Sequence, residues 1–336
     1  MDHHIAVVGA TGQIGEALLA ALADAGISSK FVHAIASAES AGKRVGFGNS
    51  YLTVADLASA DLSGVELALL AVPPASAASL AEKLAGQGIL VVDLSGVLLA
   101  DPSVPMVVPG LNDAVLVDCR ERNLVACADG VVTSVVALLR QLQGLATVQA
   151  VDLTVLQPAS RFGGKAVEEL ASQTARLLGS QQPDTQVFPE RLAFAVLEPG
   201  RKPLGSGPVA YAASTEVALQ RLFAGDGIDV SVASAVMPLF FGQAVQLRIT
   251  TDRELDVPLL RERLLAAGMD VTGLNDEGDA VALAGTLPEG TVRVADLRAL
   301  PGQRAGISLW LGLDNVAGAG VINGVQTVQL LIKDYL

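Results

Sequence analysis

Residues Val7–Leu19 read VVGATGQIGEALL, and in them a short apolar strand runs directly into a glycine-spaced turn that opens a helix. Gly9 allows the tight turn, Gly12 lets the backbone approach a pyrophosphate, and Gly15 lets the helix pack closely on the strand. The amides and the dipole of the helix would then face the phosphates. The stretch predicts a dinucleotide site, with contacts from Gly9, Ala10, Thr11, Gly12, Gln13, Ile14 and Gly15. The alternative is a glycine turn that only packs a helix against a sheet.

The composition limits the classes of function that the chain can have. Its 336 residues are enough for two domains that each bury a core. The hydrophobic share is 51%, but no apolar run is long enough to cross a membrane, so we assign it to buried strands and helices. A formal net charge of −13, without a Lys/Arg cluster, argues against nucleic acid or an anionic membrane as a partner. The first strand begins by about His4, which leaves no room for a signal peptide, so we expect a cytoplasmic protein.

Short apolar strands alternate with helical segments in the first part of the chain. We predict strands at Ile5–Val8, Phe31–Ala36, Leu67–Val72 and Ile89–Asp93. Helical stretches such as Ala75–Ala85 separate them. Near-continuous apolar strands of this kind belong to a parallel sheet that is covered on both faces. The pattern therefore predicts an α/β fold with a Rossmann-like, doubly wound nucleotide domain.

The pattern changes after about Ala128, where strands alternate between apolar and polar residues. Val245, Leu247 and Ile249 alternate with polar neighbours, and so do Ile307, Leu309 and Leu311. Such strands have one buried face and one face that is open or meets a partner. Helices predicted at Lys165–Leu178 and Val257–Ala267 make this domain α+β.

The last segment carries Val321, Val325, Val328, Leu331 and Ile332 at helical spacing. This spacing predicts an amphipathic helix that can pack back on the first domain. We therefore assign residues 1–128 plus 315–336 to the dinucleotide-binding domain and residues 129–314 to an α+β dimerisation domain of the substrate-binding type.

Further motifs resemble those of the aspartate-semialdehyde dehydrogenase family and, within it, of its degenerate Usg homologues. Besides GATGQIG, the likeness is carried by ASAESAGK at Ala36–Lys43, VVDLSG at Val91–Gly96, VVPGLN at Val107–Asn112, VVALLRQL at Val135–Leu142 and DNVAGAGVINGVQ at Asp314–Gln326. It covers nearly the whole chain. The resemblance implies an amino-acid biosynthesis context, a nucleotide domain completed by the last helix, and a second domain that forms a homodimer.

In the resembling enzymes a cysteine thiolate attacks an acyl phosphate or aldehyde, and the thiohemiacetal gives hydride to the nicotinamide. A histidine acts as acid and base, a glutamine orients the thiol, and arginines bind the substrate carboxylate and the phosphate. Aligning the motifs places Gly130 at the cysteine, Gln243 at the histidine and Val236 at the carboxylate-binding arginine. The phosphate arginine is replaced by Leu99. Only the glutamine is retained, as Gln157, and without its partners we expect it to be a hydrogen-bonded remnant rather than a catalytic residue.

The distribution of cysteine and histidine leads to the same conclusion without an alignment. No cysteine or histidine follows Cys127, so a Cys–His mechanism cannot be built in the second domain. Cys119 and Cys127 are too few and too close for a disulfide framework or a metal site. We expect Cys127 to be buried at the end of a strand, where a thiol has a high pKa and reacts poorly. We therefore predict a pseudoenzyme with no catalytic residue and no bound metal.

Three functions remain open at this point. The first is a non-catalytic dimeric protein that binds a ligand or regulates a partner. The second is an NAD(P)-dependent oxidoreductase acting on a different aldehyde or oxo substrate, with acid and base groups from Ser95, Asp129, Ser160 or Tyr211. The third is a subunit that forms a mixed dimer with an active paralogue.

The loop after the second predicted strand indicates which of the two dinucleotides, NAD or NADP, the protein would prefer. In the resembling enzymes it reads S-A-R-S, and its arginine faces the extra phosphate of NADP; here Ser37, Glu39 and Ser40 occupy the loop. A carboxylate accepts hydrogen bonds from a ribose diol but repels a phosphate, so we expect NAD to be favoured over NADP if either is bound. The closing motif adds Asn315 as a further cofactor contact. Alternatively, Glu39 is a solvated charge in a protein that binds neither.

Overall fold

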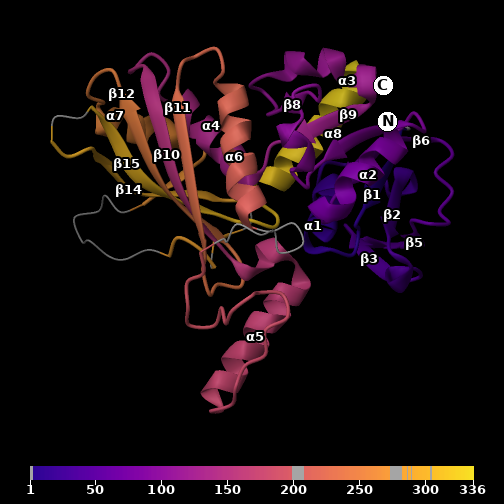
Figure 1. The fold of residues 1–336 in the computed structure, drawn as a ribbon. Helices are drawn as coiled ribbons and strands as arrows, with labels where there is room; N and C mark the ends of the chain where they lie inside the picture. The colour runs from indigo at the N-terminus through magenta and orange to yellow at the C-terminus, as the bar shows by residue number, and fades with distance from the viewer. Residues whose placement is uncertain (1–2, 199–207, 273–281, 286, 289, 303–304) are drawn as a thin grey trace. The chain divides into compact units, whose positions relative to one another are not determined.

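The chain forms two compact units in a computed structural model that describes residues 3–198, 208–272, 282–285, 287–288, 290–302 and 305–336 (Figure 1). The first unit consists of Met1–Asp129 and Gly320–Leu336, and the second of Gly130–Ala319. The first contains the glycine turn, and the second contains the four positions that the sequence motifs predict for the family's catalytic and substrate-binding residues.

The first unit is built on a seven-stranded sheet in the order β5-β2-β1-β6-β7-β9-β8, with every pairing parallel. Its strands are β1 (His4–Val8), β2 (Val32–Ala36), β5 (Ala55–Asp56), β6 (Val65–Leu70), β7 (Leu90–Asp93), β8 (Met106–Val107) and β9 (Leu124–Cys127). The chain runs from β1 outward to β2 and β5 and then returns to β6 on the other side of β1. This reversal is the topological switch of a doubly wound fold, and it confirms the predicted fold class.

Helices cover this parallel sheet and bury their apolar side chains against it. They are α1 (Gln13–Asp24), α2 (Pro74–Ala85), the short α3 (Cys119–Arg122) and most of α8 (Ala319–Asp334), and a hairpin of β3 (Arg44–Phe47) and β4 (Ser50–Thr53) lies beside them. Leu18 and Leu22 of α1 share one buried cluster with Val328 and Leu331 of α8. The final helix therefore packs into the core of the first unit, as its apolar spacing predicts.

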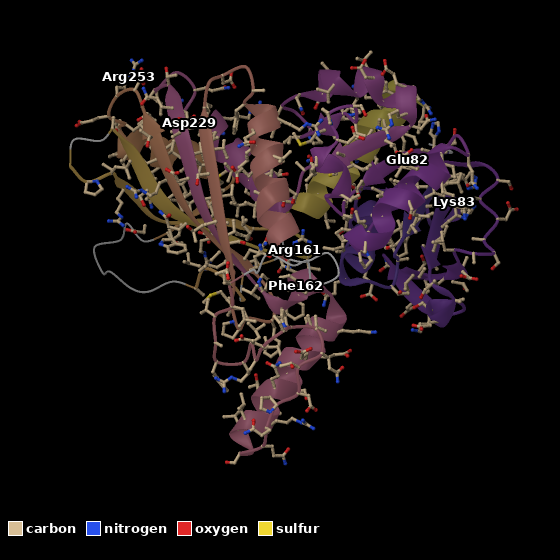
Figure 2. The ribbon with its side chains drawn as sticks, in the orientation of Figure 1. Glu82, Lys83, Arg161, Phe162, Asp229 and Arg253 are labelled. Atoms are coloured by element: carbon tan, nitrogen blue, oxygen red, sulfur yellow. The ribbon has the colours of Figure 1, made fainter. Side chains whose placement is uncertain are left out.

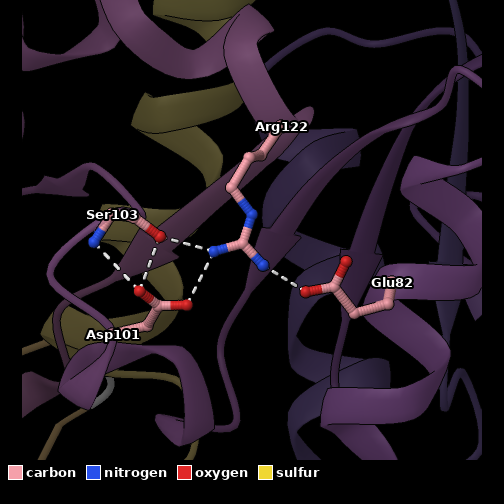
Figure 3. Close-up of polar contacts among 4 residues, drawn as sticks. All are labelled: Glu82, Asp101, Ser103 and Arg122. Atoms are coloured by element: carbon pink, nitrogen blue, oxygen red, sulfur yellow. Dashed lines mark hydrogen bonds and ion pairs between the residues drawn. The ribbon is translucent and has the colours of Figure 1, made fainter.

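A polar network ties α2 to the segment before β8 (Figure 3). The Arg122 guanidinium donates to Asp101 Oδ2 at 2.7 Å and to Ser103 Oγ at 2.5 Å, and it pairs with Glu82 on α2. The hydrogen bond from Ser103, followed by that from Arg122, lowers the pKa of Asp101 to about 2. The side chains are partly exposed, so the network positions surface segments and adds little to stability.

A histidine pair lies at the amino end of the same sheet. His4 Nδ1 and His33 Nε2 are 2.8 Å apart, and the His4 ring packs edge-on against Phe31. Burial, followed by the charge of His4, lowers the pKa of His33 below its ordinary value of 6.5.

The pair makes stability depend on pH in a defined direction. Because the pKa of His33 is lower in the folded than in the unfolded protein, the unfolded state binds more protons as the pH falls below about 6.5. We expect the melting temperature to fall between pH 7 and pH 5, and to fall less in His33→Gln. Melting curves of the wild type and of His33→Gln across this range test it. Equal slopes for wild type and His33→Gln would contradict it.

The second unit is built on a six-stranded mixed sheet in the order β11-β10-β12-β15-β14-β13. Its strands are β10 (Val148–Gln157), β11 (Asp229–Val236), β12 (Gln243–Thr251), β13 (Asp270–Val271), β14 (Val292–Ala299) and β15 (Gly306–Leu313), and its longer helices include α4 (Gly130–Arg140), α6 (Pro208–Leu222) and α7 (Val257–Ala266). On β10, Val151, Leu153 and Val155 are buried, whereas Asp152 is exposed. The predicted alternation is therefore present, with one face of the sheet in the core.

Helix α5 (Gly164–Leu178) extends away from this mixed sheet (Figure 1). Two buried polar side chains bind the following segment along it. Glu169 accepts from the amide of Gln186 at 3.0 Å, and Gln173 Oε1 accepts from the amides of Leu192 and Ala193. Among the described helices, none has both the length and the apolar content needed to cross a bilayer.

Candidate functional site

The glycine turn lies at the carboxyl end of β1, the edge where doubly wound sheets bind ligands. Gly9 has a φ of +93°, and a Cβ there would lie 2.4 Å from the carbonyl oxygen of Ala71. A Cβ at Gly15 would lie 2.1 Å from the carbonyl oxygen of Gly9. A Cβ at Gly12 would lie 3.3 Å from the same oxygen. Tight packing therefore requires glycine at Gly9 and Gly15 but not at Gly12.

The first turn of α1 presents backbone amides that the helix itself cannot satisfy. Gly12 is its N-cap residue and makes no side-chain capping hydrogen bond. The amides of Gln13, Ile14 and Gly15 precede the first amide that donates within the helix, which is Glu16 N, bonded to Gly12 O at 2.8 Å. These amides form an arrangement that suits phosphate oxygens.

The loop after β2 approaches this turn. Ser40 is buried, and its Oγ lies 3.2 Å from Thr11 Oγ1 and 3.4 Å from Lys43 Nζ. The structure therefore brings together two residues that the sequence predicts for the cofactor, Thr11 and Ser40. Glu39 is exposed beside them. Lys43 is a residue that the sequence analysis did not select, although it ends the quoted ASAESAGK motif.

Two further polar groups of the first unit were also not selected. Asn323 on α8 is buried and donates from Nδ2 to the carbonyl oxygen of Ala128 at 2.8 Å, while its Oδ1 has no partner. The Asp93 carboxylate is buried and accepts from the amide and hydroxyl of Ser95 and from the amide of Leu98. Ser95 therefore serves as a hydrogen-bond donor to Asp93. Asn323 falls within the quoted DNVAGAGVINGVQ motif, which is the signal that could have identified it.

The Cys127 thiol is enclosed by the first unit. Cys127 ends β9, is 3% exposed, and its thiol donates to the carbonyl oxygen of Ala128 at 3.7 Å. Burial, followed by the charge of Asp93, raises the pKa of the Cys127 thiol. The expectation of a thiol buried at the end of a strand is confirmed, and its weak reactivity stays a prediction.

The second unit brings together three positions that are far apart in sequence. Gln157 and Val236 are register partners on the parallel strands β10 and β11. The antiparallel register of β10 and β12, which pairs Leu156 with Ala244, continues to place Gln157 opposite Gln243. Side chains at opposite positions share a face of the sheet. Gln157, Val236 and Gln243 are 0%, 2% and 4% exposed, and we call these three residues the amide cluster.

The structure corrects one expectation at this cluster. Gln157 was expected to be a hydrogen-bonded remnant, but neither Nε2 nor Oε1 of its side chain has a partner. Its backbone is satisfied, because its carbonyl oxygen accepts from Met237 N at 2.8 Å. The strand register explains the missing partner: Val236 is the neighbour of Gln157 on β11, and its side chain offers no polar atom to the amide. The sequence alone does not reveal this pairing.

Asn315, predicted as a cofactor contact, is engaged within the second unit. Its Oδ1 accepts from Gly242 N at 2.7 Å, and its Nδ2 donates to Ser160 Oγ at 3.0 Å. Asn315 therefore ties the end of β15 to the segments that follow β10 and precede β12. The Ser160 hydroxyl accepts the hydrogen bond from Asn315 and is therefore engaged as well.

Two other positions from the sequence analysis lie in helices of the second unit. Gly130 begins α4, and the side chain of Tyr211 lies outside the described residues.

Labelled residues mark the two ends of the mixed sheet (Figure 2). Asp229 and Arg253 mark one end, where β11 begins and β12 has ended. Arg161 and Phe162 mark the opposite end, next to Ser160 and the amide cluster.

Across the described residues, no group of three or more His, Cys, Asp and Glu side chains is arranged to hold a metal ion.

Comparisons with known proteins extend over the whole chain. Residues 4–118 match the family model for the semialdehyde dehydrogenase NAD binding domain. The USG-1 protein homolog of Pseudomonas aeruginosa is 32% identical, over 99% of this chain and 98% of its own. The aspartate-semialdehyde dehydrogenase of Legionella pneumophila is 27% identical, over 100% and 98%.

Solved structures agree with these sequence matches. A probable aspartate-semialdehyde dehydrogenase from Pseudomonas aeruginosa has a TM-score of 0.89 at 31% identity, with all of both chains covered. The aspartate semialdehyde dehydrogenase II of Vibrio cholerae, complexed with ASA, has a TM-score of 0.89 at 26% identity, again with both chains fully covered. The similarity therefore includes both units.

Proposed function

Because the chain belongs to the aspartate-semialdehyde dehydrogenase family, we propose that it binds a dinucleotide and a small ligand without carrying out the dehydrogenase reaction. The observation that carries the proposal is the amide cluster. At the positions that align with the family's histidine and carboxylate-binding arginine, Gln243 and Val236 lie beside Gln157 on one buried face. A glutamine cannot exchange protons near neutral pH, and a valine cannot bind a carboxylate.

The alternative of a different oxidoreductase receives less support. Two of its candidate acid and base groups, Ser95 and Ser160, are buried and are engaged by Asp93 and Asn315. Neither hydroxyl has an imidazole or an amine among its described partners to activate it. A ligand-binding or regulatory role needs no such group.

Retention of the dinucleotide is supported by the first unit. The glycine turn, the unpaired amides of α1 and the buried Ser40 are consistent with the matched NAD binding domain. We propose that NAD is the preferred cofactor, because Glu39 repels the extra phosphate of NADP. Lys43 in the same loop carries a positive charge that attracts the extra phosphate of NADP. The size of the preference for NAD therefore depends on both charges.

We expect NAD to bind about ten-fold more tightly than NADP, and Glu39→Arg to reverse the preference by removing the repulsion and adding a phosphate ligand. Calorimetric titration of both dinucleotides at fixed salt measures it. Glu121→Arg, the same charge change on the exposed face of α3, is the matched control and should leave the ratio unchanged. Tighter NADP binding by the native protein would refute the assignment.

We further propose that the protein is a homodimer formed through the open face of the mixed sheet. On that face Asp152 is the partner of Arg248, and Gln246 is the partner of Trp310. Trp310 is only partly buried within its own unit, and a large aromatic side chain on a flat sheet face is a typical interface residue. A mixed dimer with an active paralogue would use the same face.

Light scattering at micromolar concentration is expected to give the mass of a dimer. Trp310→Asp should give the monomer mass, because it places a charge in the buried contact. Gln220→Asp, on the exposed side of α6, should remain dimeric. A monomeric native protein would overturn the homodimer, and capture of the active paralogue instead of self-association would favour the mixed dimer.

A further inference from the structure

The unpartnered amide of Gln157 is the most unusual polar group of the second unit. It is fully buried, and its donor and its acceptor both lack partners. Most buried side-chain polar atoms in proteins are hydrogen-bonded, because removing them from water without a partner is unfavourable. A leucine would occupy similar space without this penalty. The amide therefore indicates a group that is supplied from outside the chain.

The chemistry of the amide limits what that group can be. A primary amide has two N–H donors on Nε2 and one acceptor on Oε1. An anion offers only acceptors and would face Oε1 with negative charge, and a cation offers only donors. A carboxamide offers both in one plane, so it can pair with the Gln157 amide at two points.

The neighbouring residues also favour a neutral group. Val236 is apolar and lies beside Gln157 on β11, and Gln243 lies opposite it on β12. The three side chains of the amide cluster carry no formal charge, so they offer a charged ligand no counter-ion to offset its lost hydration. A second buried glutamine beside the first extends the neutral hydrogen-bonding surface.

From this geometry we propose that the amide cluster binds the carboxamide group of a neutral small ligand. The inference rests on the proposed function, because a reactive Cys–His site at this place would require a reactive carbonyl instead. It names the chemical class of the ligand that the non-catalytic protein recognises.

A matched set of probes tests the proposal. Butyramide, butyrate and butylammonium share one carbon skeleton and differ only in their charge and hydrogen-bonding groups. The side-chain amide signals of Gln157 are followed by NMR while each probe is titrated into the full-length protein without dinucleotide. We expect saturable shifts with butyramide and at least about ten-fold weaker binding of the two charged probes.

Variants separate recognition from folding. Gln157→Leu should fold, melt a few degrees higher because the orphan amide is gone, and lose butyramide binding. Gln157→Glu, which keeps the shape but replaces the donor with a second acceptor, should lose butyramide and gain butylammonium. Gln220→Leu removes an amide from the surface of α6 and should bind as wild type. For Gln157→Leu and Gln157→Glu, which lack the Gln157 side-chain amide signal, binding is read from the Gln243 amide.

Three results would overturn the proposal: binding of butyrate as tight as that of butyramide, full binding by Gln157→Leu, or no response to any probe. In the last case, a high-resolution crystal structure with ordered water on both Gln157 atoms would identify water as the partner. Dinucleotide titration and the dehydrogenase assay test the proposed function separately. A protein that binds NAD and lacks turnover but ignores butyramide would disprove only the present inference.

Discussion

Purified protein is expected not to reduce NAD or NADP when it is given aspartate semialdehyde and phosphate. The reaction of the family needs a thiolate nucleophile and a proton-exchanging group, and these act as a unit worth several orders of magnitude in rate. We predict Gly130 and Gln243 at these two positions, and neither side chain supplies such a group. The increase in nicotinamide absorbance, compared with an enzyme-free blank, measures the outcome.

Restoring one residue should not restore the reaction. Gly130→Cys supplies a thiol, but the amide cluster still lacks an acid–base group and a carboxylate ligand, so we expect almost no recovery. Adding Gln243→His and Val236→Arg to Gly130→Cys should give more turnover than the sum of the single variants, since catalytic groups are strongly non-additive. The single Gln243→His variant is the control.

The native thiol at Cys127 provides the test that could overturn this expectation. It is buried and its pKa is raised, so alkylating reagents should modify it slowly. Native turnover clearly above the blank, abolished when Cys127 is alkylated, would show that a different thiol has taken over the reaction. The proposed non-catalytic role would then be wrong.

The fold could be predicted because its signals are local. The strands at β1, β2, β6 and β7 are continuous apolar runs, and the turn after β1 needs glycine for steric reasons that its spacing reveals. The β3–β4 hairpin and the two-residue strands β5 and β8 were not predicted. These strands have two to four residues each, which is too short to show a periodic pattern of apolar residues. Pairing with neighbouring strands, rather than intrinsic β propensity, holds them in place.

The candidate site could be predicted only in part, because its decisive property is tertiary. Alignment identifies Gln157, Val236 and Gln243 one by one, but only strand register shows that they share a buried face. Whether an amide finds a partner depends on every side chain around it, and no local pattern encodes that. The expectation for Gln157 was wrong for this reason.

Gly15→Ala is expected to destabilise the first unit by about 3 kcal/mol and to abolish dinucleotide binding. The new Cβ would lie 2.1 Å from the carbonyl oxygen of Gly9 and 2.8 Å from Ala10 Cα. The turn cannot move away easily, because the amides of Gly9 and Ala10 both donate to Ile35 O, at 2.8 and 3.0 Å. Helix α1 must therefore shift off β1, and its first-turn amides move with it. Urea unfolding and NAD titration measure the two effects.

Two further alanine variants separate packing from cofactor contact. Gly46→Ala on β3 meets no atom within 4 Å and should leave stability and binding unchanged. Gly12→Ala has an ordinary φ of −85° and a Cβ 3.3 Å from Gly9 O, so the protein should stay folded. Its methyl group nevertheless occupies the path by which a pyrophosphate reaches the amides of α1, so NAD binding should fall while the urea midpoint stays nearly native. If Gly12→Ala binds NAD as wild type, the pyrophosphate does not approach this turn. If Gly15→Ala keeps both its urea midpoint and its NAD affinity, close packing of α1 on β1 does not hold the site together.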